Sequence, residues 1–492
     1  MKLSADTLGD LHPEIARPAY DRSKVTAGIL HVGLGNFHRA HQAVYLDDLL
    51  AKGGAPDWGI LGAGVMPADT TMREGLKEQD CLYTVLEQDA SGDAGRIIGV
   101  MTDFAPVSAN HAGILRAMEN PAIRIVSLTV TEGGYFVSAE TGGFNPDHPA
   151  ILADIANPDA PGTIFGAIVA GLRARRAAGQ VPFTVMSCDN VPHNGDVCRA
   201  AVLGIAAGQD TELAAWIGEN VAFPNGMVDR ITPATTEARV THLRETFGIE
   251  DARPVFCEPF RQWVLEDKFT AGRPALEEVG VQFVPDVTPY EHMKIRILNG
   301  GHAMIAYAGA LLGLTYAHDA MAHELVRGFL EKVETEEVIP IVPPVPDTSL
   351  TEYFKLIEAR FSNPRVEDTL ARLCHDGSNR QPKFIVPSAA DCLAAGRSVD
   401  GLALASALWC RYCFGTGELH EEIPENDPAW DRLVETSKEA RNRPEAWLEM
   451  SDIYGEVGQS PIFREAFARA LNSLWVNGTE ATLKTYLDGA LS

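Results

Sequence analysis

Short apolar runs and helical patterns alternate through the first half of the chain. Four runs bounded by turn residues predict buried strands, at residues 29–32, 58–65, 123–130 and 183–187. After the first of them, residues 39–52 carry apolar positions at helical spacing. Alternation of this kind predicts an α/β fold with a mostly parallel sheet covered by helices.

The pattern changes near residue 285. From Pro289 onward it is mainly helical, and a proline-rich stretch at residues 339–346 predicts a rigid connector. A chain of 492 residues is also too long for one ordinary core. We therefore predict an α/β domain over residues 1–285 and a mainly α-helical domain over 286–492. A cleft between two domains is where a ligand site is expected.

Composition narrows the class of partner. The formal net charge is −26 at pH 7, which argues against a nucleic-acid or anionic-membrane partner because both are polyanions. The first residues form no apolar signal segment, and the longest nearly apolar run, residues 303–314, is too short to span a bilayer. These features predict a cytoplasmic protein.

The eight cysteines are expected to be thiols in that compartment. Only Cys410 and Cys413 have a spacing typical of metal or redox sites. No second cysteine pair or histidine pair at a suitable spacing accompanies them, and they lie in an apolar, helix-like stretch. Core packing is therefore the preferred interpretation of this pair.

A glycine loop follows the first predicted strand and opens the first helix. Gly33 would allow a tight turn, and Gly35 would let the backbone approach a pyrophosphate at the helix N-terminus. The third glycine of the usual dinucleotide fingerprint is absent, because His38 occupies its position. The strand–loop–helix context favours dinucleotide binding over an ordinary glycine turn.

Two further features surround this loop. Asp69 lies just beyond the second predicted strand, where a carboxylate accepts hydrogen bonds from a ribose hydroxyl and repels a 2′-phosphate. It favours NAD over NADP, although a loop or helix-cap role fits the same position. His38 and His41 would share a helix face, but two histidines alone make a poor metal site. Packing or polar support beneath the loop is preferred, and we predict no metal.

The most informative segment is the predicted helix that starts at Pro289. At about 100° per residue, four of its polar side chains fall within an arc of roughly 140°. They are Glu291, Lys294, Asn299 and His302. Because the helix continues into an apolar stretch, this stripe is not merely a solvated face. Gly300 and Gly301 would let a ligand or a backbone approach closely, and they also allow a bend.

The stripe suits alcohol oxidation without a metal. A base must take the hydroxyl proton while hydride leaves the carbon. A lysine such as Lys294 can serve when burial lowers its pKa, because burial disfavours the charged form. Asn299 and His302 would stabilise the developing alkoxide as neutral donors. A buried hydrogen-bond network between the two domains is the alternative reading of the same residues.

Two loops offer further polar groups. Asn190 lies at the end of the fourth predicted strand, where ligands bind in parallel sheets. It would pair with Asn299 around an oxyanion, or else serve as a turn former, and the nearby Asn194-Gly pair is interpreted as a turn. Asp229 and Arg230 could form a buried ion pair with one another, or Asp229 could be a carboxylate in a pocket, and the sequence favours neither interpretation.

These segments together resemble the long-chain mannitol dehydrogenase family of polyol-specific dehydrogenases and reductases. The resemblance runs through nearly the whole chain. It rests on the glycine loop, on Cys188-Asp189-Asn190, on Asp229-Arg230 and above all on the Lys-x4-Asn-x2-His spacing of residues 294–302. The missing third glycine is the family's own pattern.

The resemblance implies a fold, a reaction and residue roles. An expanded Rossmann-type domain would bind NAD, and a mainly α-helical domain would follow it. Lys294 would be the general acid/base, Asn190 and Asn299 would hold the reacting oxygen, and His302 would bind and orient the substrate. The other implied roles are support by Glu291 and Asp229, substrate binding by Arg372 and Arg380, and cofactor binding by Gly33, Gly35, Asn36, Phe37 and Asp69.

The family acts on mannitol, arabinitol and sorbitol, or reduces fructuronate and tagaturonate. Arg372 and Arg380 do not decide among these, because basic side chains hydrogen-bond hydroxyls and also pair with carboxylates. Residues 382–387 resemble the mannitol members, which favours zinc-independent, NAD-dependent oxidation of mannitol to fructose. Fructuronate reduction, another polyol and a non-catalytic dinucleotide-binding sensor are the alternatives. Members are often monomers, which favours a monomer here.

Overall fold

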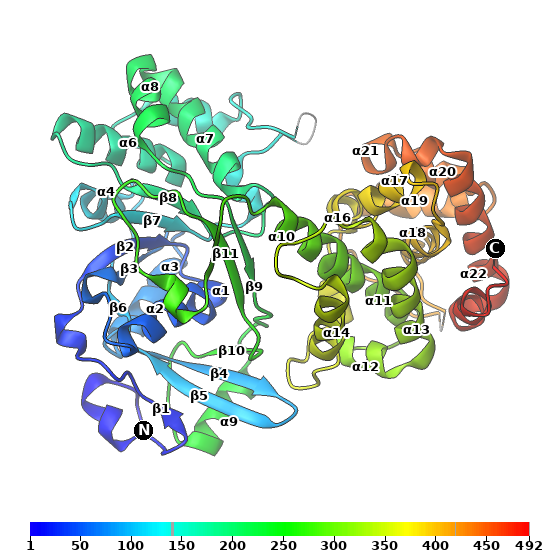
Figure 1. Cartoon of the computed structure of the whole chain (residues 1–492), viewed down its shortest axis with the longest axis horizontal. Coiled ribbons are helices and arrows are strands. Elements are labelled where there is room, and N and C mark those ends of the chain that lie inside the picture. Colours follow the sequence, from blue (N-terminus) through cyan, green and yellow to red (C-terminus); the bar gives the residue numbers. More distant parts are fainter. Residues whose placement is uncertain (139–141, 419, 492) are drawn as a thin grey trace. The chain divides into compact units, whose positions relative to one another are not determined.

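The computed structural model describes residues 1–138, 142–418 and 420–491 (Figure 1). The chain divides into two compact units, Met1–Thr288 and Pro289–Ser492. The first contains the named strands and the second is built of helices. Among the residues that the structure describes, no helix is both long and apolar enough to cross a membrane.

The central sheet of the first unit has five parallel strands in the order β6-β3-β2-β7-β8. They are β2 (Ala27–Val32), β3 (Gly59–Ala63), β6 (Met101–Phe104), β7 (Ile125–Leu128) and β8 (Thr184–Ser187). The predicted parallel sheet is confirmed, with shorter strands than expected at the second and third positions. The strand order reverses between β2 and β7, so their carboxyl ends form the switch point where open parallel sheets bind ligands.

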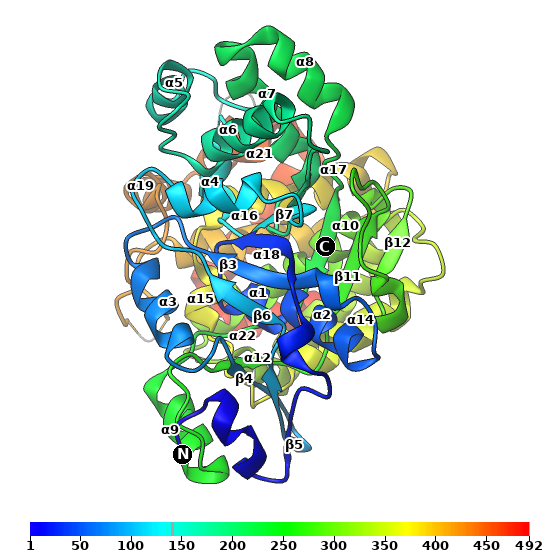
Figure 2. The same cartoon turned by 90° about the vertical axis from the view of Figure 1, so that its left-hand side faces the viewer.

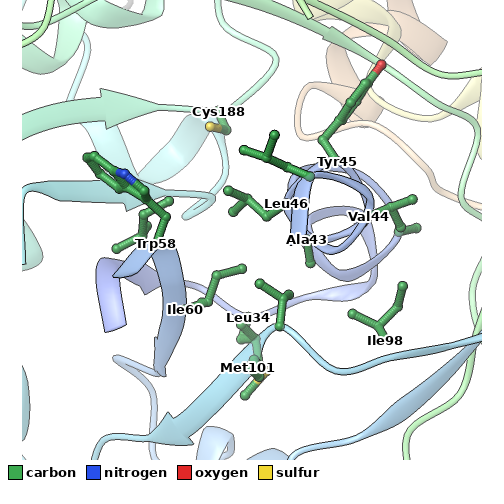
Figure 3. Packing of buried hydrophobic residues seen from close by; sticks show 14 of the residues in the cluster. Leu34, Ala43, Val44, Tyr45, Leu46, Trp58, Ile60, Ile98, Met101 and Cys188 are labelled. Carbon is green, nitrogen blue, oxygen red and sulfur yellow. The ribbon is translucent and has the colours of Figure 1, made fainter. Parts of the chain in front are cut away.

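Helices cover both faces of this sheet because both faces of its strands are apolar. Ile29 of β2 packs into one core cluster and its neighbour Leu30 into another. Figure 3 shows the first cluster, in which Ala43 and Leu46 of a covering helix face Ile60 of β3. The helices of this unit are α1 (Asn36–Ala40), α2 (Gln42–Ala51), α3 (Asp69–Lys77), α4 (Ala112–Glu119), α5 (Pro149–Ala156), α6 (Ile164–Ala177), α7 (Asn194–Gln209), α8 (Thr211–Asn220) and α9 (Glu237–Phe247).

The single helix predicted over residues 39–52 is wrong. The structure has two helices there, α1 and α2, which meet at His41, where φ is −121° and ψ is −88°. Leaving helical geometry lets the buried His41 ring donate from Nε2 to the carbonyl oxygen of Gln262 at 2.8 Å. A partner more than 200 residues away in sequence thus overrides the local helical pattern.

Two smaller sheets flank the central one and were not anticipated. One has the order β1-β5-β4-β10 and contains an antiparallel hairpin, and the other has the order β12-β11-β9. Their strands are β1 (Ile15–Ala16), β4 (Tyr83–Asp89), β5 (Gly92–Ile98), β9 (Gly226–Asp229), β10 (Val255–Cys257), β11 (Gln262–Glu266) and β12 (Gln282–Val284). Figure 2 shows the N-terminal segment beside α9, where Leu3, Leu82 and Leu243 share a small separate core.

The second unit is helical, as predicted from Pro289 onward. Its two longest core helices, α18 and α22, pack on one another, and α22 is broken at Gly478, where φ is +81°. The carboxylate of Glu418 accepts the freed N–H of Thr479 at 2.6 Å. The helices are α10 (Thr288–Met293), α11 (Gly300–Leu311), α12 (Ala317–Ala322), α13 (Glu324–Val333), α14 (Leu350–Phe361), α15 (Leu370–Cys374), α16 (Gly377–Phe384), α17 (Val386–Ala394), α18 (Asp400–Tyr412), α19 (Trp430–Ala440), α20 (Glu445–Leu448), α21 (Ser451–Tyr454) and α22 (Pro461–Leu487), with π-helices at Lys294–Asn299 and Glu334–Val338.

Candidate active site

The glycine loop lies at the switch point between β2 and β7. Gly33 has φ of +91°, and a Cβ atom there would lie 2.1 Å from the carbonyl oxygen of Thr129. No other residue fits, because both the backbone conformation and the space exclude a side chain. The Thr129 hydroxyl donates to the carbonyl oxygen of Gly33 at 2.6 Å. The end of β7 therefore fixes the start of the loop.

His31 lies beneath this loop, and its tautomer follows from its partners. The Thr129 hydroxyl already donates to Gly33, so it accepts from Nε2–H of His31 at 2.9 Å. Nδ1 of His31 then accepts from the Ser127 hydroxyl at 2.8 Å. Burial lowers the pKa of His31 to about 3, which keeps the ring neutral. No local sequence pattern indicates this hydrogen-bond chain, because Ser127 and Thr129 lie far from His31 along the chain.

His38 and His41 make packing and hydrogen-bond contacts that support the glycine loop. The His38 ring stacks on His31 with centroids 3.3 Å apart, and burial lowers the pKa of His38 well below its usual range. Gln42 donates to Nδ1 of His41 at 3.0 Å. Within the described parts of the chain, no group of three or more His, Cys, Asp or Glu residues is arranged to hold a metal ion.

The remaining loop residues differ in which of their groups could contact a cofactor. A Cβ atom at Gly35 would have no neighbour closer than 3.9 Å, so open space adjoins the backbone there. The Asn36 side chain accepts from Arg39 at 2.6 Å and donates to Thr235 at 3.2 Å. The Phe37 ring stacks on His41. Asn36 and Phe37 therefore offer a cofactor their backbone more readily than their side chains.

Asp69 is the first residue of α3, directly after the loop that follows β3. Its Oδ2 accepts the N–H of Met66 at 2.8 Å, and its side chain folds over Gly64. The loop or helix-cap role that the sequence left open is thus what the carboxylate does in this structure. Contact with a ribose hydroxyl stays a prediction.

Asn190 is exposed directly after the end of β8, beside a carboxylate that organises the neighbouring loop. Asp189 accepts from the N–H of Thr131 at 2.8 Å, from the N–H of Val130 at 3.0 Å and from the Tyr135 hydroxyl at 2.6 Å. Thr131 has φ of +69°, a strained conformation for a β-branched residue. Asp189 therefore holds a strained segment at the end of β7.

The interpretation of Asn194 as part of a turn is wrong. Asn194 is fully buried and is the first residue of α7. Its amide donates to the carbonyl oxygens of Asp189 at 3.0 Å and Gly226 at 2.8 Å, and its Oδ1 accepts the N–H of Gly226 at 2.9 Å. It ties the end of β8 to the start of β9, and Asn-Gly turn statistics give no sign of that long-range role.

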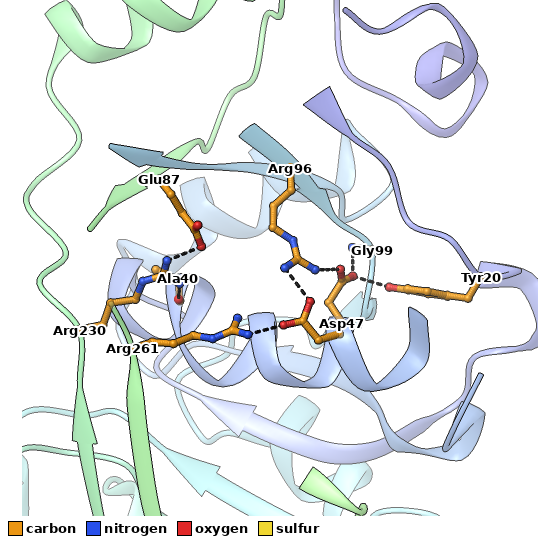
Figure 4. A network of polar contacts seen from close by, with 9 residues as sticks. Tyr20, Ala40, Asp47, Glu87, Arg96, Gly99, Arg230 and Arg261 are labelled. Atoms are coloured by element: carbon orange, nitrogen blue, oxygen red, sulfur yellow. Dashed lines mark hydrogen bonds and ion pairs between the residues drawn. The ribbon is translucent and has the colours of Figure 1, made fainter. Parts of the chain in front are cut away.

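Asp229 ends β9, and its neighbour Arg230 anchors the surrounding elements (Figure 4). Arg230 donates to the carbonyl oxygens of Glu258 at 2.9 Å and Ala40 at 2.5 Å, and it pairs with Glu87 at 2.5 Å. Asp229 is buried and lies opposite Gln262 in the strand ladder. Because Gln262 accepts from His41, Asp229 and the glycine-loop helices share one rigid connection.

In the second unit, the polar stripe runs through a π-helix. Residues Lys294–Asn299 form i→i+5 hydrogen bonds between α10 and α11, which have ordinary α geometry. The predicted angles of 100° per residue are therefore wrong across this segment, because a π-helix turns less per residue. Lys294 is only 7 % exposed, and Glu291 is buried as well. Single-turn π segments are frequent at functional sites.

The glycines after the π-helix allow close packing rather than a bend. A Cβ atom at Gly301 would lie 3.3 Å from Leu330 and 3.4 Å from Phe361. The His302 ring stacks on Phe361 with centroids 4.0 Å apart.

Oδ1 of Asn299 is buried and has no hydrogen-bond partner among the described residues. A ligand donor would satisfy this acceptor.

Glu334, which the sequence analysis missed, lies beneath Gly301. Its carboxyl is fully buried, and neither oxygen has a hydrogen-bond partner within the described chain. A Cβ atom at Gly301 would lie 3.6 Å from Oε1. Burial raises the pKa of Glu334 well above its usual range. The group is therefore a neutral acid packed against the helix that carries His302.

Arg372 and Arg380 lie on α15 and α16, and α15 packs against α11. Arg372 forms a two-pronged ion pair with Asp368, with both N–O distances 2.6 Å. Arg380 donates to the carbonyl oxygens of Arg372 at 3.4 Å and Leu373 at 3.1 Å. The Arg380 side chain is thus held against the backbone of the segment that carries Arg372.

Cys410 and Cys413 are buried free thiols at the C-terminal end of α18. Burial raises the pKa of both, which opposes thiolate chemistry. Their position agrees with the predicted core packing.

Comparison with known proteins covers both units. Residues 27–278 match the mannitol dehydrogenase Rossmann domain, and residues 286–475 match the mannitol dehydrogenase C-terminal domain. A mannitol 2-dehydrogenase of Cereibacter sphaeroides is 58% identical over 473 residues, which are 96% of this chain and 99% of that protein. A mannitol 2-dehydrogenase of Phaeosphaeria nodorum is 42% identical, over 99% of this chain and 86% of that protein.

Two solved structures share the whole fold. The Pseudomonas fluorescens mannitol 2-dehydrogenase, in a ternary complex with NAD and D-mannitol, superposes with a TM-score of 0.90 at 43% identity, covering 99% of this chain and 100% of that one. A substrate-free D-sorbitol dehydrogenase gives the same TM-score of 0.90 at 36% identity, covering 98% and 100%. The family that the sequence resembles is confirmed, and the chain belongs to the mannitol dehydrogenase family.

Proposed function

We propose that this protein catalyses the reversible oxidation of D-mannitol to D-fructose with NAD. The observation that carries the proposal is the series Lys294, Asn299 and His302, which runs through a π-helix into α11, in a chain 58% identical to a mannitol 2-dehydrogenase. The ternary complex of the similar Pseudomonas fluorescens enzyme contains the same cofactor and polyol. The first unit would bind NAD and the second would supply most of the substrate and catalytic residues, which corresponds to the predicted domains 1–285 and 286–492.

The glycine loop fits a dinucleotide. Gly33 is held at the switch point, and the backbone of Gly35 adjoins open space that a pyrophosphate would fill, with the N–H groups of Asn36 and Phe37 as the proposed donors. Asp69 would accept from the adenosine ribose, in addition to its bond to Met66. NAD, when bound, supplies the acceptor for the hydride that leaves the alcohol carbon.

Proton transfer is the work of the second unit in this proposal. Lys294, as a neutral amine, would take the hydroxyl proton as the carbonyl forms, and Asn190 and Asn299 would donate to the oxygen as it gains negative charge. The open Oδ1 of Asn299 would meanwhile accept from a substrate hydroxyl. His302 would orient the sugar chain. Glu291 and Asp229 would support this network, and Arg372 and Arg380 would hold the distal hydroxyls.

The deciding experiment follows NADH consumption by the purified protein, without added metal and with EDTA present. D-fructose and D-fructuronate are compared, each with NADH and with NADPH, and D-mannitol and D-sorbitol are compared with NAD, because either polyol gives D-fructose when it is oxidised at C2. Preferred turnover of fructose with NADH supports the proposal. Preferred turnover of fructuronate would indicate uronate reduction as the function. If the protein turned over neither these substrates nor other polyols, the dinucleotide-sensor alternative would be favoured. The monomeric state and cytoplasmic location expected from the sequence stay predictions, and light scattering tests the first.

A further inference from the structure

The ion pair between Asp368 and Arg372 has an unusual distribution of exposure. The Asp368 side chain is 6 % exposed, whereas that of Arg372 is 54 % exposed. The carbonyl oxygen of Asp368 accepts the N–H of Ala317 at 2.8 Å, and Leu370 bonds to the carbonyl oxygen of Thr315 at 2.9 Å. The carboxylate is therefore fixed by its backbone, and the arginine is held by the carboxylate.

This geometry changes what Arg372 can offer a ligand. Nε and Nη2 bind the two carboxylate oxygens, which leaves the N–H groups of Nη1 and one of Nη2 as donors. The positive charge is compensated at the same time. The group thus presents hydrogen-bond donors without net charge, which suits hydroxyl groups. A carboxylate placed there would face the like charge of Asp368.

We propose that Asp368 is a specificity-determining residue, which neutralises Arg372 and so selects a polyol or ketose with an uncharged terminus over one that ends in a carboxylate. The inference rests on the proposed function, and in particular on Arg372 holding the distal end of the substrate. Asp368 acts through Arg372 and is a positioning residue.

The test compares kcat/KM for D-fructuronate and D-fructose in wild type and in D368N. Freeing the guanidinium gains a charge-assisted hydrogen bond to the carboxylate, so the fructuronate-to-fructose ratio rises by about tenfold or more. The matched control is E352Q, which removes one negative charge from an exposed ion pair with Lys355 in the same unit and leaves the ratio unchanged. D368A removes the carboxylate by truncation and gives the same direction of change, should D368N not fold.

A double-mutant cycle separates this effect from a general change in charge. In R372Q/D368N the gain in the ratio disappears, because the freed guanidinium is gone. A ratio unchanged in the folded Asp368 variants, or a gain that survives in R372Q/D368N, overturns the inference. Wild-type activity distinguishes the two levels of the proposal: if wild type does not oxidise mannitol with NAD, the proposed function fails before specificity is tested.

Discussion

Glu334 is a fully buried carboxyl group beside Gly301, and the raised pKa of this group has a thermodynamic consequence. The usual pKa of 4.5 applies to the unfolded chain, and burial raises the pKa in the folded protein. Between these two values the folded state holds a proton that the unfolded state lacks. Stability therefore falls as pH rises through this window, by up to about 1.4 kcal/mol per pH unit.

We expect Glu334→Gln to remove this dependence, because glutamine keeps the shape and cannot ionise. The difference in free energy of unfolding between variant and wild type should grow in favour of the variant as pH rises above about 5. Urea unfolding across that pH range measures it, with the exposed Glu352→Gln as control. A constant difference at all pH values would show that Glu334 does not titrate as described.

Lys294 is the residue on which the chemistry depends most directly. Lys294→Ala should lower kcat by about 10²- to 10⁴-fold, because general acid–base catalysis contributes about that much. NAD affinity, measured by fluorescence titration, should stay near the wild-type value, since the cofactor loop lies in the other unit. The exposed Lys355→Ala serves as control. Unchanged turnover in the Lys294 variant contradicts the assignment.

The types and spacing of the site residues could be predicted from the sequence, but their partners could not. The Lys-x4-Asn-x2-His series lies within one short segment, so its spacing can be recognised in the sequence. Asp189 accepts hydrogen bonds from residues 54 to 59 positions away, and Asn194 bonds to Gly226, 32 positions away, and no local sequence pattern indicates such bonds. The orphan carboxyl of Glu334 also has no signature, because a glutamate in a helical pattern usually faces solvent.

At the scale of elements, the two glycines of the glycine loop are expected to respond differently to substitution. Gly33→Ala should destabilise the protein, because the new Cβ meets the Thr129 carbonyl and φ is positive. Gly35→Ala should fold normally, since φ is −79° and no atom lies within 3.9 Å, yet bind NAD at least about tenfold more weakly. Thermal melting and NAD titration measure the two effects. Normal NAD affinity in folded Gly35→Ala would remove the pyrophosphate from this loop.

The elements found from the sequence are those with strong local periodicity. The parallel sheet and the helical second half were visible, because buried strands and amphipathic helices carry distinct patterns. The break at His41 was not, because a hydrogen bond to Gln262 decides it. The β4–β5 hairpin was also overlooked, although Ser91-Gly92, where β5 begins and Gly92 has φ of +137°, is a sequence typical of a hairpin turn.

At the scale of the whole molecule, the two units should respond differently to the cofactor alone. We expect NAD without polyol to slow amide hydrogen exchange at residues 33–38 and 129–136, which surround the switch point. Exchange in the core helix α18 of the second unit should be unchanged. Mass spectrometry of proteolytic fragments resolves both regions. Protection confined to the second unit would reverse the proposed division of roles between the units.

The π-helix at Lys294–Asn299 also makes chain length a functional property. It accommodates one residue more than an α-helix of the same height, so the extra residue changes which side chains share a face within the segment while the helices on either side keep their directions. Deleting one residue there would close the segment into an ordinary α-helix, in which successive residues turn by about 100°. Lys294 and Asn299 would then point in different directions relative to one another, although neither had been substituted. Related sequences should therefore keep the length of this segment even where they substitute its apolar residues.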